Sequence, residues 1–256
     1  MSDYAFGDSE LAADRLARLA RLFAPAMESI LDEVPIAPRR VVDLGCGPGY
    51  TTRLLGERWP RAAVIGFDTS DAFVERARAS GVDAELADVT GPLPDGQSYD
   101  LAYARFLLAH LGDGAAAVEL WCRGLTPHAC LVLEETESIS SDDPDFARYE
   151  AITRGVVQGR GAPLYAGPSI ARIEAPAGFE RMVDRVIDID LTAGEAASLF
   201  WRNIPNWAEQ AVSDRLASRD ELEALGKRLR TREGDGRRGC FEWRQRQTII
   251  ASVEVA

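Results

Sequence analysis

The chain of 256 residues has a single lysine, Lys227, two histidines, and four cysteines that are scattered without a Cys-x-x-Cys pair. So few metal-ligating and redox-active side chains argue against a metal site and against a disulfide framework. No apolar run approaches the roughly 18 residues of a membrane-spanning helix, and no basic-then-apolar segment begins the chain. We therefore expect a cytoplasmic protein that does not bind membranes.

The chain also lacks an excess of positive charge. Its net charge is −12 and its pI is about 4.8, whereas nucleic acids and anionic membrane surfaces bind basic faces. The length suits one large α/β domain or a core domain with inserts. A small-molecule ligand is therefore expected rather than a nucleic acid.

The most informative stretch is 41–50, VVDLGCGPGY. Two valines lead to Asp43, and glycines then alternate at Gly45, Gly47 and Gly49 before a helix-like segment. A strand that ends in a glycine turn and feeds a helix is the first unit of a doubly wound α/β sheet. Glycines let the backbone turn sharply and approach a ligand closely.

A dinucleotide-binding fingerprint, G-x-G-x-x-G, would need glycine where this chain has Tyr50. The spacing that is present, D-x-G-x-G-x-G, resembles motif I of class I S-adenosylmethionine-dependent methyltransferases. The resemblance implies a Rossmann-like seven-stranded sheet with its last strand antiparallel and with helical cap inserts. It also implies S-adenosylmethionine as cofactor, S-adenosylhomocysteine as product, and cofactor contacts from the motif residues Asp43, Gly45, Cys46, Gly47 and Gly49.

Two further acids follow predicted strands. Asp68 ends the segment AVIGFD, where the family has a carboxylate that binds the ribose; alternatively it only caps the next helix, and Thr69 lies beside it. Asp88 and Val89 follow the next short strand, where the resemblance implies contacts of an acid and of a backbone with the adenine. The alternative for Asp88 is a turn-forming role.

The segment YDLAYA at 99–104 matches the family's fourth strand, and the resemblance places Ala104 and Arg105 at the cofactor. Arg105 could pair with the cofactor's carboxylate, or with an acid at the surface. His110 is a candidate general base, because its pKa suits neutral pH, or else a structural histidine. Since the sulfonium already activates the methyl group, positioning can suffice for in-line displacement.

The pattern divides the chain into residues 1–35, a helical segment, and residues 36–256, the methyltransferase domain. The first segment is expected to act as a lid, with Tyr4 on the cofactor, or to pack only on the sheet edge; Pro25 should kink or split its helix. Cap inserts are expected at about 136–167 and 193–238.

Acceptor contacts are expected from the end of the fifth strand and from the inserts, at Glu135, Tyr165, Trp201, Asn203 and Trp207. Tryptophans at helical spacing can equally form the core between cap helices. The predicted acceptor is a small molecule methylated on oxygen or nitrogen, and a homodimer stays open. Two other functions stay open: a non-catalytic module that binds S-adenosylmethionine, and a nicotinamide-dependent oxidoreductase.

Overall fold

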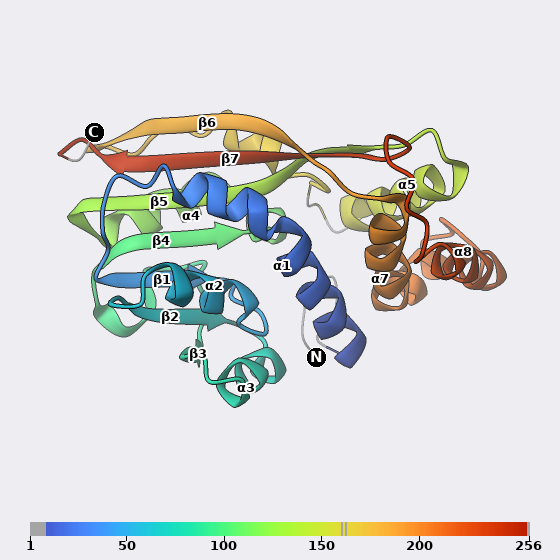
Figure 1. Cartoon of the computed structure of the whole chain (residues 1–256), viewed down its shortest axis with the longest axis horizontal. Coiled ribbons are helices and arrows are strands. Elements are labelled where there is room, and N and C mark those ends of the chain that lie inside the picture. The colour runs from blue at the N-terminus through green and yellow to red at the C-terminus, as the bar shows by residue number, and fades with distance from the viewer. Residues whose placement is uncertain (1–8, 160, 162, 255–256) are drawn as a thin grey trace.

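The fold is built on a seven-stranded sheet in the order β3-β2-β1-β4-β5-β7-β6 (Figure 1). The computed structural model describes residues 9–159, 161 and 163–254. All strands are parallel except β7, which pairs antiparallel with both neighbours. The strands are β1 (Arg40–Leu44), β2 (Ala63–Asp68), β3 (Ala84–Leu86), β4 (Tyr99–Arg105), β5 (Leu125–Ser140), β6 (Phe179–Ile189) and β7 (Glu242–Ser252). This order and the antiparallel last strand confirm the predicted fold class.

Helices flank the sheet and gather beyond the carboxyl ends of its central strands (Figure 1). They are α1 (Glu10–Leu31), α2 (Tyr50–Arg58), α3 (Asp71–Ala79), α4 (Gly114–Arg123), α5 (Pro144–Gly159), α6 (Gly167–Ile170), α7 (Ala193–Ser213) and α8 (Arg219–Thr231), with 3₁₀ turns η1 (Pro94–Gly96) and η2 (Leu108–His110). Side chains of Ser9, Ser70, Asp113, Thr192 and Ser218 cap five of them, which satisfies backbone N–H groups that a helix start leaves open.

The core has one layer on each face of the sheet and a third part in the cap. The C-terminal half of α1 packs with α2 against one face, and α4 packs against the other. Helices α5, α7 and α8 form an aromatic-rich cap core together with the first half of α1. Because strand ends of the sheet lie under this cap, the fold places the glycine turn and the cap on the same edge.

Helix α1 belongs to two of these layers. Leu19 and Phe23 are buried in the cap core, whereas Met27 and Ile30 are buried against the sheet. Pro25 lies between the two groups, inside a helix that continues through it without being split. Proline lacks an N–H, so the backbone ladder has one hydrogen bond fewer at this boundary.

Some predicted boundaries differ from the structure. Strand β5 begins at Leu125, which pairs with Tyr99 of β4 before the register shifts. The first residues of the expected insert at 136–167 extend β5 to Ser140 because they pair with β7. Helix α6 is a single turn, and β6 follows from Phe179.

Candidate active site

The glycine turn connects β1 to α2 in a backbone conformation that needs glycine. Gly45, Gly47 and Gly49 have φ angles of +69°, +54° and +81°, a region that residues with a Cβ rarely adopt. The N–H groups of Gly45 and Cys46 both donate to the carbonyl of Phe67 at 2.8 and 3.0 Å. The turn is thus pinned to the end of β2.

The three glycines face different surroundings. A Cβ on Gly45 would lie 2.8 Å from Leu107, and one on Gly49 would lie 2.9 Å from Ala77, so both are packed against protein. Among the described residues, a Cβ on Gly47 would meet only Leu16 of α1, at 3.7 Å. Gly47 is therefore where the turn leaves room for a ligand, and α1 lies over it.

Asp68 joins the turn to the carboxyl end of β2. Its carboxylate is buried and accepts hydrogen bonds from the N–H of Gly47 and the N–H of Ser70, each at 2.8 Å. The structure thus brings Asp68, the predicted ribose-binding acid, next to Gly47 of the glycine turn, while Thr69 between the strand and α3 is exposed. Ser70, not Asp68, caps α3 with its side chain.

Asp43 lies beneath the turn rather than on its surface. It is 1% exposed, and its carboxylate accepts a hydrogen bond from the Thr52 hydroxyl at 2.6 Å. Burial raises the pKa of Asp43 to about 7, while the Thr52 hydrogen bond and the charge of Arg105 oppose that shift. Asp43 therefore fixes the start of α2, and its position allows only an indirect effect on a ligand.

Arg105 ends β4 beside the first turn of α2. Its guanidinium donates to the Thr51 hydroxyl at 2.8 Å and approaches the sulfur of Met27 at 3.9 Å. Within residues 9–159, 161 and 163–254, no carboxylate lies within 4 Å of it in an ion pair. This half-buried cation next to the glycine turn is well suited to bind an anionic group of a ligand.

The adenine-side candidates lie in the loop after β3. Asp88 is exposed and accepts a hydrogen bond from the Thr90 N–H at 2.8 Å, which lowers the pKa of Asp88. Val89 is buried, and its carbonyl accepts a hydrogen bond from the Trp121 indole at 2.8 Å. Trp121 of α4 thus positions this loop. Helical spacing in the sequence can indicate that Trp121 is buried, but it cannot indicate that Trp121 contacts Val89.

The loop after β4 is held from inside by Glu135. This carboxyl, expected to touch the acceptor, is 1% exposed and accepts a hydrogen bond from the Leu108 N–H at 2.6 Å. Burial raises its pKa to about 8, although N–H groups of the loop lower it. Glu135 thereby fixes η2, which ends at His110. Ala104, a predicted cofactor contact before this loop, is fully buried.

Phe106 in this loop has a φ angle of +55°, unusual for a residue with a bulky side chain. Its ring packs edge-on against Phe23 of α1, with centroids 5.3 Å apart, and lies 6.3 Å from the ring of Trp243. Strained backbone of this kind is found at ligand sites more often than elsewhere. The packing of the Phe106 ring therefore holds the loop that carries Arg105 and His110 in this conformation.

Glu134 is the centre of a buried polar network on the α1 face of the sheet. It is fully buried and accepts hydrogen bonds from the Tyr103 hydroxyl and from the amides of Gln245 and Gln247, the last two at 3.2 and 2.7 Å. Burial raises its pKa, and Arg105 opposes that shift. Gln247 also donates to a backbone carbonyl of α1, so the network ties the sheet to that helix.

The acceptor candidates of the inserts lie in or on the cap. Trp207 is 1% exposed in the cap core, and the Asn203 amide donates to the Tyr149 hydroxyl at 2.8 Å. Trp201 faces outward, donates to Glu233 and lines a groove of about 380 Å³ between α7 and α8. The Tyr165 hydroxyl is hydrogen-bonded to a carboxylate of α5 at 2.9 Å. The structure does not bring these four side chains to one point.

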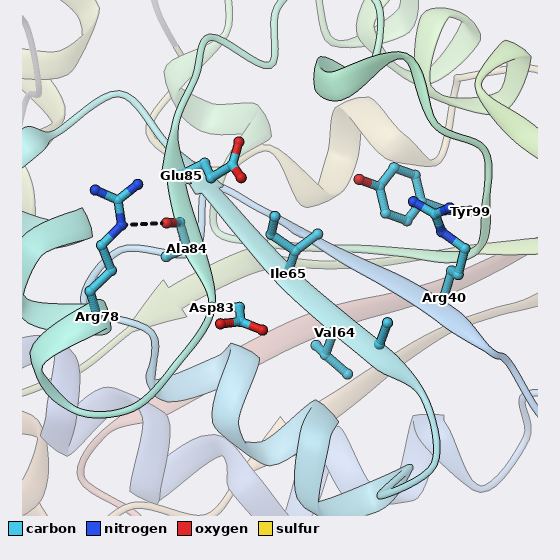
Figure 2. Close-up of a pocket in the computed structure, with 9 residues that line it drawn as sticks. Arg40, Val64, Ile65, Arg78, Asp83, Ala84, Glu85 and Tyr99 are labelled. Carbon is cyan, nitrogen blue, oxygen red and sulfur yellow. Dashed lines mark hydrogen bonds between the residues drawn. The ribbon is translucent and has the colours of Figure 1, made fainter.

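A separate hollow lies at the other end of the sheet. Its volume is about 440 Å³. Figure 2 shows the charged and apolar side chains that line it, among them Arg40, Ile65, Arg78, Glu85 and Tyr99. Most of these residues stand near the amino ends of β1, β2, β3 and β4. The carboxyl ends carry the glycine turn, so this cavity is distinct from the candidate active site.

Tyr4 lies outside the described residues, so its expected contact stays a prediction. Within the described part of the chain, no group of three or more His, Cys, Asp or Glu side chains could hold a metal ion. No helix there is both long enough and apolar enough to cross a membrane.

Comparison with known families decides where the chain belongs. Residues 7–183 match the family model described as a methyltransferase domain. The chain belongs to this family. The matched region runs from before α1 into β6 and contains the glycine turn, Asp68, Arg105 and Glu135.

Relatives of this methyltransferase-domain protein include a trans-aconitate 2-methyltransferase of Methylobacterium nodulans. It is 34% identical over 178 residues, which cover 68% of this chain and 64% of the relative. The chain thus aligns with slightly less than two thirds of that relative's length. A second trans-aconitate 2-methyltransferase, from Methylobacterium radiotolerans, is 33% identical and is covered to 65%.

A solved structure shares the fold of this methyltransferase-domain protein at low identity. A mycolic acid cyclopropane synthase in complex with S-adenosylhomocysteine superposes with a TM-score of 0.57 and 18% identity, over 91% of this chain and 84% of that one. At this identity the likeness supports the architecture alone.

Proposed function

We propose that the protein transfers a methyl group from S-adenosylmethionine to a small-molecule acceptor. The observation that carries this proposal is the glycine turn, with Gly47 leaving room for a ligand on one side and, beside it, the guanidinium of Arg105, which forms no ion pair with any described residue. The family membership supports the same reaction class.

The residues present fit this cofactor. Arg105 would bind its carboxylate, because a guanidinium matches that group in charge and shape. Asp68 would bind the ribose hydroxyls, since its buried carboxylate already stands at the Gly47 backbone. Asp88 and the Val89 backbone would contact the adenine. When bound, the cofactor supplies a methyl group that its sulfonium has already activated.

The protein's own contribution is positioning and, for some acceptors, proton removal. Phe106 and the loop fixed by Glu135 hold the acceptor side of the site. His110 at the end of η2 would take a proton from an acceptor hydroxyl or amine as attack proceeds. An acceptor that is already an anion needs no such base.

The first half of α1 would act as the lid. Leu16 covers Gly47, and Phe23 covers Phe106, so both ligands must pass this helix. Pro25 separates that half from the sheet-anchored half, and the missing N–H makes this the point where bending costs least. The lid thus lies within residues 1–35, and residues 36–256 are the catalytic domain, with the cap around the acceptor.

The experiment incubates the protein with S-adenosylmethionine and candidate acceptors and measures S-adenosylhomocysteine by mass spectrometry. Trans-aconitate is the first acceptor to assay, because curated relatives carry its name. The expected result is product formation that Gly47→Val abolishes and Trp59→Phe leaves intact. Calorimetry with S-adenosylhomocysteine and a fluorescence titration with NADH run in parallel. Binding of NADH without binding of S-adenosylhomocysteine would reject the proposal, whereas cofactor binding without turnover of any acceptor would favour a non-catalytic module.

A further inference from the structure

Two side chains of β7 carry buried polar atoms that have no hydrogen-bond partner in the described part of the chain. They are the indole nitrogen of Trp243 and the side-chain oxygen of Gln245. Trp243 is 8% exposed and Gln245 is fully buried. Because buried polar groups are nearly always paired in folded proteins, each such atom requires an explanation. Residues two apart on a strand share a face, so the donor and the acceptor point to the same side of β7.

The amide of Gln245 is oriented by its neighbours. Its nitrogen donates to Glu134 at 3.2 Å, which is also the acceptor for Tyr103 and Gln247. This contact uses the nitrogen and leaves the oxygen for another partner. Gln247, two residues further along β7, has partners for both ends of its amide, including Arg185. Along β7, the unpaired side-chain atoms are therefore confined to the described residues at its start.

That start lies at the active-site edge of the sheet. Since β7 runs antiparallel to β5, its first residues pair with the last residues of β5, beyond the level at which β4 ends at Arg105. The ring of Trp243 lies 5.0 Å from Phe23 and 6.3 Å from Phe106, and Phe106 directly follows Arg105. The pair thus stands one aromatic ring away from the proposed cofactor site, on the side of the cap.

We propose that Trp243 and Gln245 together recognise a polar group of the methyl acceptor, an inference that rests on the function proposed above. The indole N–H donates to this group and the Gln245 oxygen accepts from it, so the group must both accept and donate a hydrogen bond. An amide or a hydroxyl does so, and a carboxylate, which only accepts, does not. The aromatic rings around Trp243 fit a flat, apolar body next to that group.

This assignment narrows the acceptor. A molecule whose only polar groups are carboxylates, as in trans-aconitate, leaves the Gln245 oxygen unpaired. An acceptor that carries an amide or hydroxyl in addition to the methylated group satisfies both atoms. For the acceptor to reach Trp243, Phe23 must move away from the indole ring, which is the lid movement of α1 described above.

The test measures binding of three fragment probes to the protein saturated with S-adenosylhomocysteine. Benzamide can both donate and accept a hydrogen bond, benzoate can only accept one, and toluene can do neither. Benzamide should bind about tenfold more tightly than the other two, as expected for hydrogen bonds to otherwise unpaired buried atoms. Equal binding of the three probes, or no binding of benzamide, would overturn the proposal.

Variants locate the effect. Trp243→Phe and Gln245→Met should each remove the preference for benzamide while leaving the affinity for S-adenosylhomocysteine unchanged. Gln245→Met also removes the hydrogen bond to Glu134, so the melting temperature of each variant is measured beside its affinities. Trp59→Phe and Gln210→Met, which alter an indole near α2 and an amide at the end of α7, are the matched controls and should keep the preference.

The outcomes separate this inference from the proposed function. If S-adenosylhomocysteine does not bind the unmodified protein, the proposed function fails and the inference fails with it. If it binds and methyl transfer occurs, yet the two β7 variants keep the preference for benzamide, only the role of Trp243 and Gln245 is rejected.

Discussion

Neutralising Glu135 should stabilise the protein at pH 8 and leave its stability nearly unchanged at pH 5. The pKa of this carboxyl is raised from 4.5 to about 8 by burial. In the folded protein it is therefore protonated at pH values where the unfolded chain has already lost the proton. Stability that Glu135 contributes is fully present below pH 4.5 and is lost as the pH rises through about 8.

The magnitude follows from the shift. Each pKa unit corresponds to about 1.4 kcal/mol, so the penalty on the native protein increases by about 3 kcal/mol from pH 5 to pH 8. Glu135→Gln removes this penalty, since an amide stays neutral, and its oxygen can still accept from the Leu108 N–H. The raised pKa of Asp43 adds a slope of the same sign, but it is present in both proteins and cancels in their difference.

Urea unfolding of both proteins at pH 5, 6, 7 and 8 measures the free energies of unfolding. The difference between Glu135→Gln and the unmodified protein should grow steadily in favour of the variant. Glu75→Gln, at an exposed position of α3, is the control and should keep the slope of the unmodified protein. A Glu135→Gln variant that is destabilised equally at pH 5 and pH 8 would refute the reasoning. It would mean that the loop N–H groups outweigh burial and hold Glu135 ionised.

Three other predictions concern the turn and the proposed base. Gly66→Ala should destabilise the fold by about 1–3 kcal/mol in urea unfolding, because the added Cβ would lie 2.6 Å from Cys46. Gly56→Ala on α2, where an added Cβ would meet no described atom within 4 Å, should stabilise the fold by about 0.5–1 kcal/mol. The opposite order of the two free energies of unfolding would contradict the packing described. Asp68→Asn should weaken S-adenosylhomocysteine binding by about 1.5–3 kcal/mol in calorimetry, because an amide cannot accept from both backbone N–H groups and the ribose; an unchanged dissociation constant would remove Asp68 from the cofactor site. His110→Ala should lower kcat for a hydroxyl or amine acceptor by about 100-fold or more without changing cofactor affinity; full turnover would make His110 structural.

The glycine turn and its acid could be predicted because both depend on local sequence. Strand, turn and helix follow one another within 41–58, and the acid at the end of the next strand must meet the turn in a parallel sheet. The resemblance of this motif to a known family also implied the seven-stranded sheet with its last strand antiparallel. Such features need no knowledge of distant contacts.

The roles of the two adjacent acids could not be predicted in the same way. Alternation along β5 indicates that Glu134 and Glu135 point to opposite faces. Which partners they meet depends on β7, more than 100 residues away, and on the loop after β4. Both carboxyls form hydrogen bonds inside the fold, and their partners come from segments whose positions local sequence does not give.

The cap shows the same limit. Helical spacing identifies apolar faces on α7, but it does not tell which face meets α5 and which meets α8. Trp207 lies on the inner face and Trp201 on the outer one, and Asn203 is buried because Tyr149, 54 positions earlier, supplies its partner. The unpaired atoms of Trp243 and Gln245 leave no trace in local sequence at all.

One consequence of α1 reaching both Gly47 and Trp243 concerns the order of events. A helix that contacts the nucleoside-side backbone through Leu16 and the acceptor-side rings through Phe23 cannot shift at one place while staying fixed at the other. Occupancy of the first site therefore changes the free energy of entry to the second, and by linkage the reverse change is equal. Steady-state rates measured against both ligands should show this as a substrate KM that depends on how much of the other ligand is present.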